Sequence, residues 1–175
     1  MNPQNVTPDD SLLVQYFQSV DTDRSGIINA LELQKALSNG SFEAFDLQTI
    51  HLMIAMFDKT KSRSIDLDAF RNLWQYITNW LNCFQSYDLD KSGQIDVREL
   101  KHALTSFGYR FSDQFYEKLM TRFEQIIHFD DFIKICIHLQ SLTDEFRRLD
   151  TDLDGMVTLS YENFVSLVFN SVLSK

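Results

Sequence analysis

The sequence is poor in cysteine, proline and glycine, and it lacks an excess of positive charge. Its 175 residues include two cysteines, two prolines and five glycines, with 25 acidic side chains against 16 Lys and Arg. Cys83 and Cys136 lie in apolar helical patterns without CxxC spacing, which favours buried, reduced thiols over a disulfide framework. The net charge of −9 argues against nucleic acid or an anionic membrane as the partner, because both would repel the chain.

Long apolar runs and catalytic motifs are also missing. The longest apolar stretches, near residues 133–139 and 164–173, are interrupted and far shorter than the roughly 20 residues that cross a bilayer, so we expect neither a signal peptide nor a membrane span. The four histidines form no HExxH pair, and the chain has no glycine-rich phosphate loop and no nucleophile elbow. We therefore expect a cytoplasmic protein that is not an enzyme, with recruitment to endomembranes and a nuclear location left open.

The most informative stretch that is present runs from Asp88 to Glu99 and reads DLDKSGQIDVRE. Oxygen-bearing residues alternate around a turn glycine, Gly93, and a carboxylate stands at position twelve, which is the ligand order of a calcium-binding EF-hand loop. The predicted ligands are Asp88, Asp90, Ser92, the Gln94 carbonyl, Asp96 and Glu99.

A second stretch, DTDRSGIINALE, repeats this order position for position. Its predicted ligands are Asp21, Asp23, Ser25, the Ile27 carbonyl, Asn29 and Glu32. An acidic surface turn is the alternative for either loop, but it does not explain why the full ligand order with its glycine occurs twice. The sequence therefore predicts two Ca²⁺ sites per chain.

Two further copies are degraded. The stretch from Asp58 to Ala69 has Arg63 where the turn glycine belongs and Ala69 where the last carboxylate belongs, so we expect a structural hand without calcium. Its Ile65 corresponds to Ile28 of the first loop, and we expect these residues to pair. Near residues 120–131 too few residues precede Ile127 for a twelve-residue loop, and no calcium is expected there.

The last copy, residues 150–161, matches only in its first half. Three carboxylates stand close together, but Tyr161 occupies position twelve. We expect weak binding of Ca²⁺ near the millimolar range, or of Mg²⁺. The weak ligands would be Asp150, Asp152, Asp154, Met156 and Thr158.

Five hands at a spacing of about thirty residues predict an all-α fold of eight helices with short paired loop strands. One domain over residues 9–175 would follow a flexible tail at residues 1–8. Because EF-hands pair, the fifth hand has no partner within its chain, and an isologous homodimer through this hand is the simplest closure. The alternatives are a last helix that packs on its own chain and a heterodimer with a related protein.

Several longer segments resemble the penta-EF-hand family, and most of all its apoptosis-linked gene 2 group. They are DRSG, LQKALSNG, the WxYITxW pattern at Trp74–Trp80, SFGYRFSDQF and LTDEFRRLDTDLDG, and the resemblance covers nearly the whole chain after residue 8. It implies a calcium sensor and adaptor, in which calcium exposes a hydrophobic groove for proline-rich peptides of membrane-trafficking or cell-death partners. A regulatory subunit of the calpain type and a passive calcium buffer are the alternatives.

The resemblance also implies the groove residues. One pocket would use Phe70, Trp74, Ile77, Phe129 and Leu139, a neighbouring one Trp80 and Tyr161, and Arg110 would act as a conformational switch. The residues alone leave this open, because aromatic side chains at helical spacing are more often ordinary core, and an isolated arginine is more often a solvated charge. The fourth hand has lost about four residues beside this predicted groove.

Overall fold

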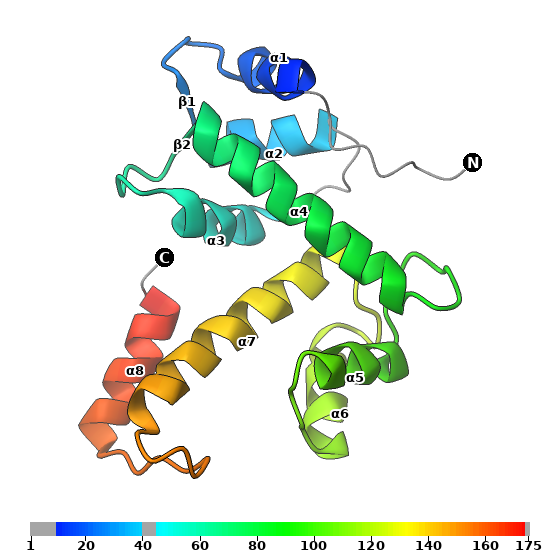
Figure 1. Cartoon of the computed structure of the whole chain (residues 1–175), viewed down its shortest axis with the longest axis vertical. Helices are drawn as coiled ribbons and strands as arrows, with labels where there is room; N and C mark the ends of the chain where they lie inside the picture. Colours follow the sequence, from blue (N-terminus) through cyan, green and yellow to red (C-terminus); the bar gives the residue numbers. More distant parts are fainter. Residues whose placement is uncertain (1–9, 40–44, 174–175) are drawn as a thin grey trace. The chain divides into compact units, whose positions relative to one another are not determined.

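The computed structural model describes residues 10–39 and 45–173, and these residues form eight helices and two short strands (Figure 1). The helices are α1 (Asp10–Val20), α2 (Ala30–Asn39), α3 (Leu47–Phe57), α4 (Leu67–Tyr87), α5 (Val97–Ser106), α6 (Asp113–Arg122), α7 (Phe129–Leu149) and α8 (Tyr161–Leu173). The strands are β1 (Ile27–Ile28) and β2 (Ile65–Asp66). The predicted all-α fold with paired loop strands is thereby confirmed, while the predicted tail at residues 1–8 lies outside the described residues.

The chain divides into two compact units, one ending at Ile133 and the other beginning at Lys134, so that the boundary falls within α7. The single domain predicted over residues 9–175 therefore stays a prediction. None of the helices in the described ranges is long and apolar enough to cross a membrane.

Most helix starts are set by a capping side chain that accepts a backbone hydrogen bond. Asp46 accepts from the Thr49 N–H at 2.6 Å before α3, and Asp66 accepts from the Ala69 N–H at 2.8 Å before α4. Ser112 takes this position before α6, where its side chain accepts from the Phe115 N–H. Asp66 is both the last residue of β2 and the cap of α4, so the strand leads directly into the helix.

The four twelve-residue loops share one backbone path. Position four has a left-handed φ of 56° to 61° in every loop, at Arg24, Lys61, Lys91 and Leu153. Position six is also left-handed, at Gly26, Arg63, Gly93 and Gly155, and its N–H donates to the carboxylate at position one at 3.0, 2.6, 2.9 and 3.1 Å respectively. The second loop therefore keeps the turn although it lacks the glycine.

The loops pair as expected in the first half of the chain. In the antiparallel sheet β1–β2, Ile28 lies opposite Ile65, which confirms the predicted contact. The third loop pairs through a single bridge, in which Ile95 and Ile127 exchange backbone hydrogen bonds of 2.8 and 3.2 Å. Only residues 123–128 separate α6 from α7, which confirms that the fourth hand lacks a twelve-residue loop.

Helix α4 supplies much of the core of the first unit. Phe70, Leu73, Trp74, Ile77 and Phe84 are buried along it, and the helix contacts α1, α3 and α5. Ring contacts join it to its neighbours: Phe17 of α1 packs edge-on against Phe70 at 5.6 Å, and Phe84 packs against Phe129 at 5.5 Å. Because burying one such side chain contributes about 1.5–3 kcal/mol, this face fixes the position of α4 and of the loop at its end.

We predict that Arg63→Gly stabilises the protein. A non-glycine residue at a left-handed φ carries a steric cost that glycine avoids, partly offset by the greater freedom of glycine in the unfolded chain. We expect the free energy of unfolding to rise by roughly 0.5–1 kcal/mol, measured by urea denaturation in the presence of a chelator. Lys59→Gly is the matched control, since Lys59 is not among the left-handed residues. Lys59→Gly should lower the free energy of unfolding. An equal decrease in that free energy for Arg63→Gly would contradict the prediction.

Candidate metal centres

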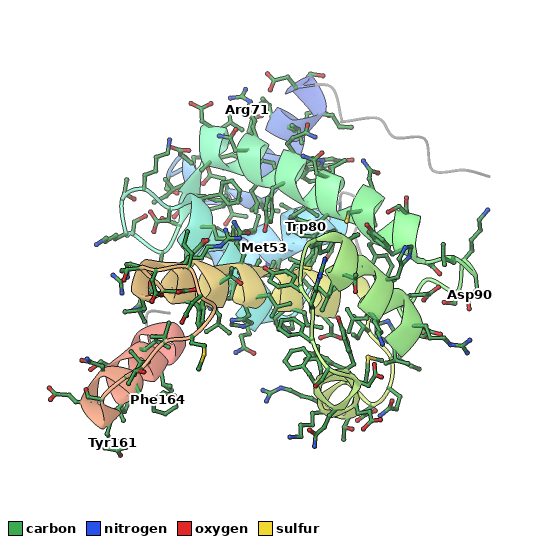
Figure 2. All side chains as sticks on the ribbon, turned by 60° about the horizontal axis from the view of Figure 1, so that its bottom comes forward. Met53, Arg71, Trp80, Asp90, Tyr161 and Phe164 are labelled. Carbon is green, nitrogen blue, oxygen red and sulfur yellow. The ribbon has the colours of Figure 1, made fainter. Side chains whose placement is uncertain are left out.

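The third loop brings three carboxylates together. Oxygen atoms of Asp88, Asp90 and Glu99 all lie within 4.8 Å of one another. Figure 2 shows Asp90 on the loop that joins α4 to α5, and Asp88 and Glu99 are only 9% and 7% exposed. Two nearly buried carboxylates side by side are costly unless a cation compensates them, and within the described residues no salt bridge reaches either one. Carboxylate, hydroxyl and carbonyl oxygens in this order suit Ca²⁺, so these residues fit the ion.

Backbone donors hold these carboxylates in place. The Ser92 N–H donates to Asp88 at 2.9 Å and to Asp90 at 3.0 Å, and hydrogen bonds from Ser92 lower the pKa of Asp90. Glu99 accepts from the Leu89 N–H at 2.8 Å and from the Asp96 N–H at 3.0 Å. The Glu99 carboxylate, the predicted last ligand, is therefore hydrogen-bonded to the beginning of the loop. It also forms a capping box with Asp96 at the start of α5.

The remaining predicted ligands of the third loop lie on the same turn. The Ser92 hydroxyl donates to the Gln94 carbonyl at 3.1 Å, so these two oxygens face each other. Asp96 serves mainly as the cap of α5, accepting from the N–H groups of Arg98 and Glu99 at 2.7 and 2.9 Å.

The first loop has the same turn but a more open end. Asp21 accepts from the N–H groups of Ser25 and Gly26 at 2.9 and 3.0 Å. The Ser25 hydroxyl donates to the Ile27 carbonyl at 2.9 Å, and its hydrogen bonds lower the pKa of Asp23.

Glu32 accounts for the difference between the first and third loops. Glu32 accepts from the Asn29 N–H at 2.9 Å, as Glu99 accepts from the Asp96 N–H. Glu99 also accepts from the Leu89 N–H at position two of its loop. In the first loop the N–H at position two, that of Thr22, donates to the Val20 carbonyl instead. In the described ranges, clusters of three carboxylates occur in the third and fifth loops but not in the first.

The fifth loop carries the other carboxylate cluster. Asp150, Asp152 and Asp154 offer oxygens within 4.8 Å of one another, and the Gly155 N–H closes the turn on Asp150. The second half of this loop offers less. Met156 and Thr158 are exposed, and Tyr161 at position twelve is 84% exposed and points away from α8 in Figure 2. Weak binding in this loop stays a prediction.

The residues of the predicted groove are found in several environments. Phe70, Trp74, Ile77 and Phe129 are buried in the first unit, whereas Arg110 is exposed between α5 and α6. Leu139 is half-buried on α7 and Tyr161 is exposed on α8, both in the second unit. The groove stays a prediction.

Trp80 is half-buried on α4 and contacts an aromatic residue that the sequence analysis missed. Its ring packs edge-on against Phe107 and Phe132 at 6.0 and 5.9 Å. Phe107 is the C-terminal cap of α5 and is 38% exposed. The signal was weak, because a single aromatic residue beside Gly108 is typical of an ordinary helix end.

Known proteins match over nearly the whole chain. The EF-hand domain pair family matches residues 10–75 and 77–168. The chain is 43% identical to peflin of Mus musculus over 176 residues, which cover 98% of this chain and 63% of peflin. It is 42% identical to sorcin of Schistosoma japonicum over 168 residues, which cover 94% of this chain and 98% of that sorcin. The chain thus spans less than two thirds of the length of the peflins that it matches.

A solved structure supports the same relationship. It is described as a homolog of programmed cell death 6 protein from Leishmania major Friedlin, and it has a TM-score of 0.74 and 31% sequence identity. The match covers 91% of this chain and 93% of that chain. Together with the sequence matches, it confirms the resemblance inferred from the motifs.

We predict that Glu99→Gln weakens calcium binding at one site by roughly tenfold or more, which corresponds to about 1.4 kcal/mol. The change keeps the shape of the side chain but removes one of three clustered negative charges. Isothermal titration calorimetry with Ca²⁺ measures the effect, and Glu32→Gln should weaken a different site. Glu117→Gln, an exposed position on α6, is the control. A titration curve for Glu99→Gln identical to that of the parent would refute the ligand assignment.

Proposed function

Because this chain belongs to the penta-EF-hand family of calcium-binding proteins, we propose that it acts as a calcium-dependent adaptor for proline-rich peptide segments. One observation carries the proposal. The third loop joins α4 to α5, and beyond it Trp80 of α4 contacts Phe107 at the end of α5. The carboxylate cluster and a partly exposed aromatic contact are thus attached to the same two helices.

This arrangement links the loop to the aromatic contact through rigid elements. Asp88 caps the C-terminus of α4, and Glu99 lies in the first turn of α5, so the separation of these carboxylates and the angle between the helices are coupled. A change in that angle also changes the contact between Trp80 and Phe107. Calcium, when bound, supplies positive charge between the carboxylates, and two ions would offset four of the nine net negative charges.

Aromatic surfaces suit proline-rich peptides, because a polyproline helix is already extended and loses little conformational entropy on binding. Trp80 and Phe107 are accessible to such a peptide, whereas Phe70, Trp74 and Ile77 are buried and require a displacement of neighbouring helices. We propose Arg110, exposed three residues after Phe107, as the residue that responds to this displacement.

The second unit favours a homodimer through the fifth hand. Within the described residues, the fifth loop has no strand partner, and α8 exposes a series of apolar side chains. They are Tyr161, Phe164, Val168 and Phe169, exposed by 84%, 54%, 40% and 55%. A symmetric pair of fifth hands would cover this face and pair the loops. The proposed setting is the cytoplasm, with recruitment to endomembranes through peptide partners.

We predict that Phe164→Glu converts the dimer to a monomer, because it places two charges in the apolar contact. Sedimentation equilibrium of the pure protein measures the mass, and Leu31→Glu on the exposed face of α2 is the control. A parent that is already monomeric would contradict the homodimer and favour a heterodimer with a related subunit.

We also predict that a short polyproline peptide binds in calcium but not in chelator, and that Trp80→Ala reduces its affinity at least roughly tenfold. Isothermal titration calorimetry with the peptide measures both affinities, because Trp80→Ala removes one of the two tryptophans that fluorescence would follow. Leu142→Ala, an exposed position on α7, should bind as the parent does. Equal dye binding to apolar surface with and without calcium would contradict the adaptor role and favour a calcium buffer.

A further inference from the structure

The second loop has the backbone conformation of a metal-binding loop, although it lacks two of the residues that characterise such a loop. It has the same two left-handed positions as the other three loops, and its Arg63 N–H donates to Asp58 at 2.6 Å, although the loop lacks both the glycine and the final carboxylate. Some interaction other than metal coordination must therefore hold the turn closed.

A network of hydroxyl groups closes it. One oxygen of Asp58 accepts from the Thr60 N–H at 2.9 Å and from the Thr60 hydroxyl at 2.8 Å. The Ser62 hydroxyl lies 3.5 Å from the same oxygen, 2.9 Å from the Thr60 hydroxyl and 2.8 Å from the hydroxyl of Ser64. Thr60 and Ser62 occupy positions three and five, where the third loop has the ligands Asp90 and Ser92. The serine at position five contacts the first carboxylate in the first and third loops as well, at 3.3 and 3.4 Å. What distinguishes the second loop is Thr60 at position three, whose hydroxyl donates to Asp58 where the other two loops have a carboxylate.

The charges of the second loop also favour a loop without a metal ion. Burial alone would raise the pKa of Asp58, but hydrogen bonds from Thr60, Arg63 and Ser62 outweigh it and lower the pKa to about 2. Lys59, Lys61 and Arg63 are exposed on this loop, and no salt bridge is found for them in the described part of the chain. The loop also contains Asp66 and Asp68, but Asp66 accepts from the Ala69 N–H as the cap of α4, and Asp68 pairs with Arg71 at 2.7 Å. The three cationic side chains lie on the half of the loop that follows Asp58, and their charge opposes the entry of a divalent cation.

The loop is connected directly to the first calcium site. Strand β2 follows it at once and pairs with β1, placing Asp66 opposite Ile27, whose carbonyl is a predicted ligand. The first loop lacks the second hydrogen bond that draws Glu99 over the third loop. The third loop, closed by its own Glu99, has only the single bridge to Ile127. The first loop is therefore the one that depends on its partner.

We propose that the second loop is a metal-free template, in which the hydroxyls of Thr60 and Ser62, bonded to Asp58, hold β2 in place against β1 and thereby set the calcium affinity of the first loop. The inference rests on the proposed function in one respect, namely that the first loop binds calcium. Thr60 and Ser62 act as positioning residues, since neither is a predicted ligand.

The test uses the full chain carrying Asp88→Ala and Asp150→Asn, which remove the first carboxylate of the third and fifth loops and leave the first loop as the one complete ligand set. In this parent, Thr60→Val with Ser62→Ala removes both hydroxyls with little change in volume. Calorimetric titration with Ca²⁺ should show an affinity roughly fivefold to tenfold lower than in the parent, equivalent to about 1–1.4 kcal/mol. Without the two background changes, the same pair of substitutions should leave the affinity of the third loop unchanged.

Thr121→Val is the matched control, because it removes a hydroxyl that bonds to the Glu117 carbonyl at 2.8 Å within α6, and it should leave the affinity unchanged. If the double variant does not fold, Thr60→Val and Thr60→Ser decide, since only Ser keeps the hydroxyl and should keep the affinity. If the parent binds Ca²⁺ and the folded double variant binds it with equal affinity, the template proposal is wrong and the first calcium site stands. A parent that binds no calcium at all would overturn the first site, and with it the template.

Discussion

A single hydrogen bond, from the N–H at position six to the carboxylate at position one, closes every twelve-residue loop of this protein. The bond requires a left-handed residue at position six, and it aims the remaining oxygens of the turn inward. It also fixes where the preceding helix ends and the loop strand begins. Helix pairing, strand pairing and the clustering of carboxylates all depend on this turn.

The negative charge of the carboxylate at position one is compensated differently in the second and third loops. In the third loop the carboxylates of Asp90 and Glu99 gather beside it, and this cluster of negative charge suits a cation. In the second loop the Thr60 hydroxyl and the Arg63 N–H donate to it, and the described residues of this loop form no cluster of three carboxylates. The same backbone therefore presents a carboxylate cluster in the third loop and a hydroxyl network in the second. The difference lies at position three, which is Asp90 in one and Thr60 in the other, since position five is serine in both.

Helix α4 leads into the third loop, and aromatic rings of neighbouring helices hold it on several sides. Its Phe70 and Trp74 are anchored by rings of α1, and its Phe84 by Phe129 of α7. Trp80, near the middle of the helix, is less enclosed and contacts Phe107. Buried rings thus hold the helix on both sides of Trp80, whose contact with Phe107 is the less enclosed one.

The sequence alone determined what depends on consecutive residues. An EF-hand loop draws its oxygens from one twelve-residue stretch, so spacing was enough to locate the loops, their turn residues and the helices around them. It was also enough to find the defects at Arg63, Ala69 and Tyr161, and the pairing of Ile28 with Ile65 followed from equivalent loop positions.

Only the tertiary structure decided which side chains meet. Glu32 and Glu99 occupy the same position in their loops, yet only Glu99 joins a cluster of carboxylates. Spacing also did not reveal the hydroxyl network around Asp58 or the contact between Trp80 and Phe107. These depend on side-chain rotamers and on packing between helices far apart in the chain, and neither is set by the local pattern of residues.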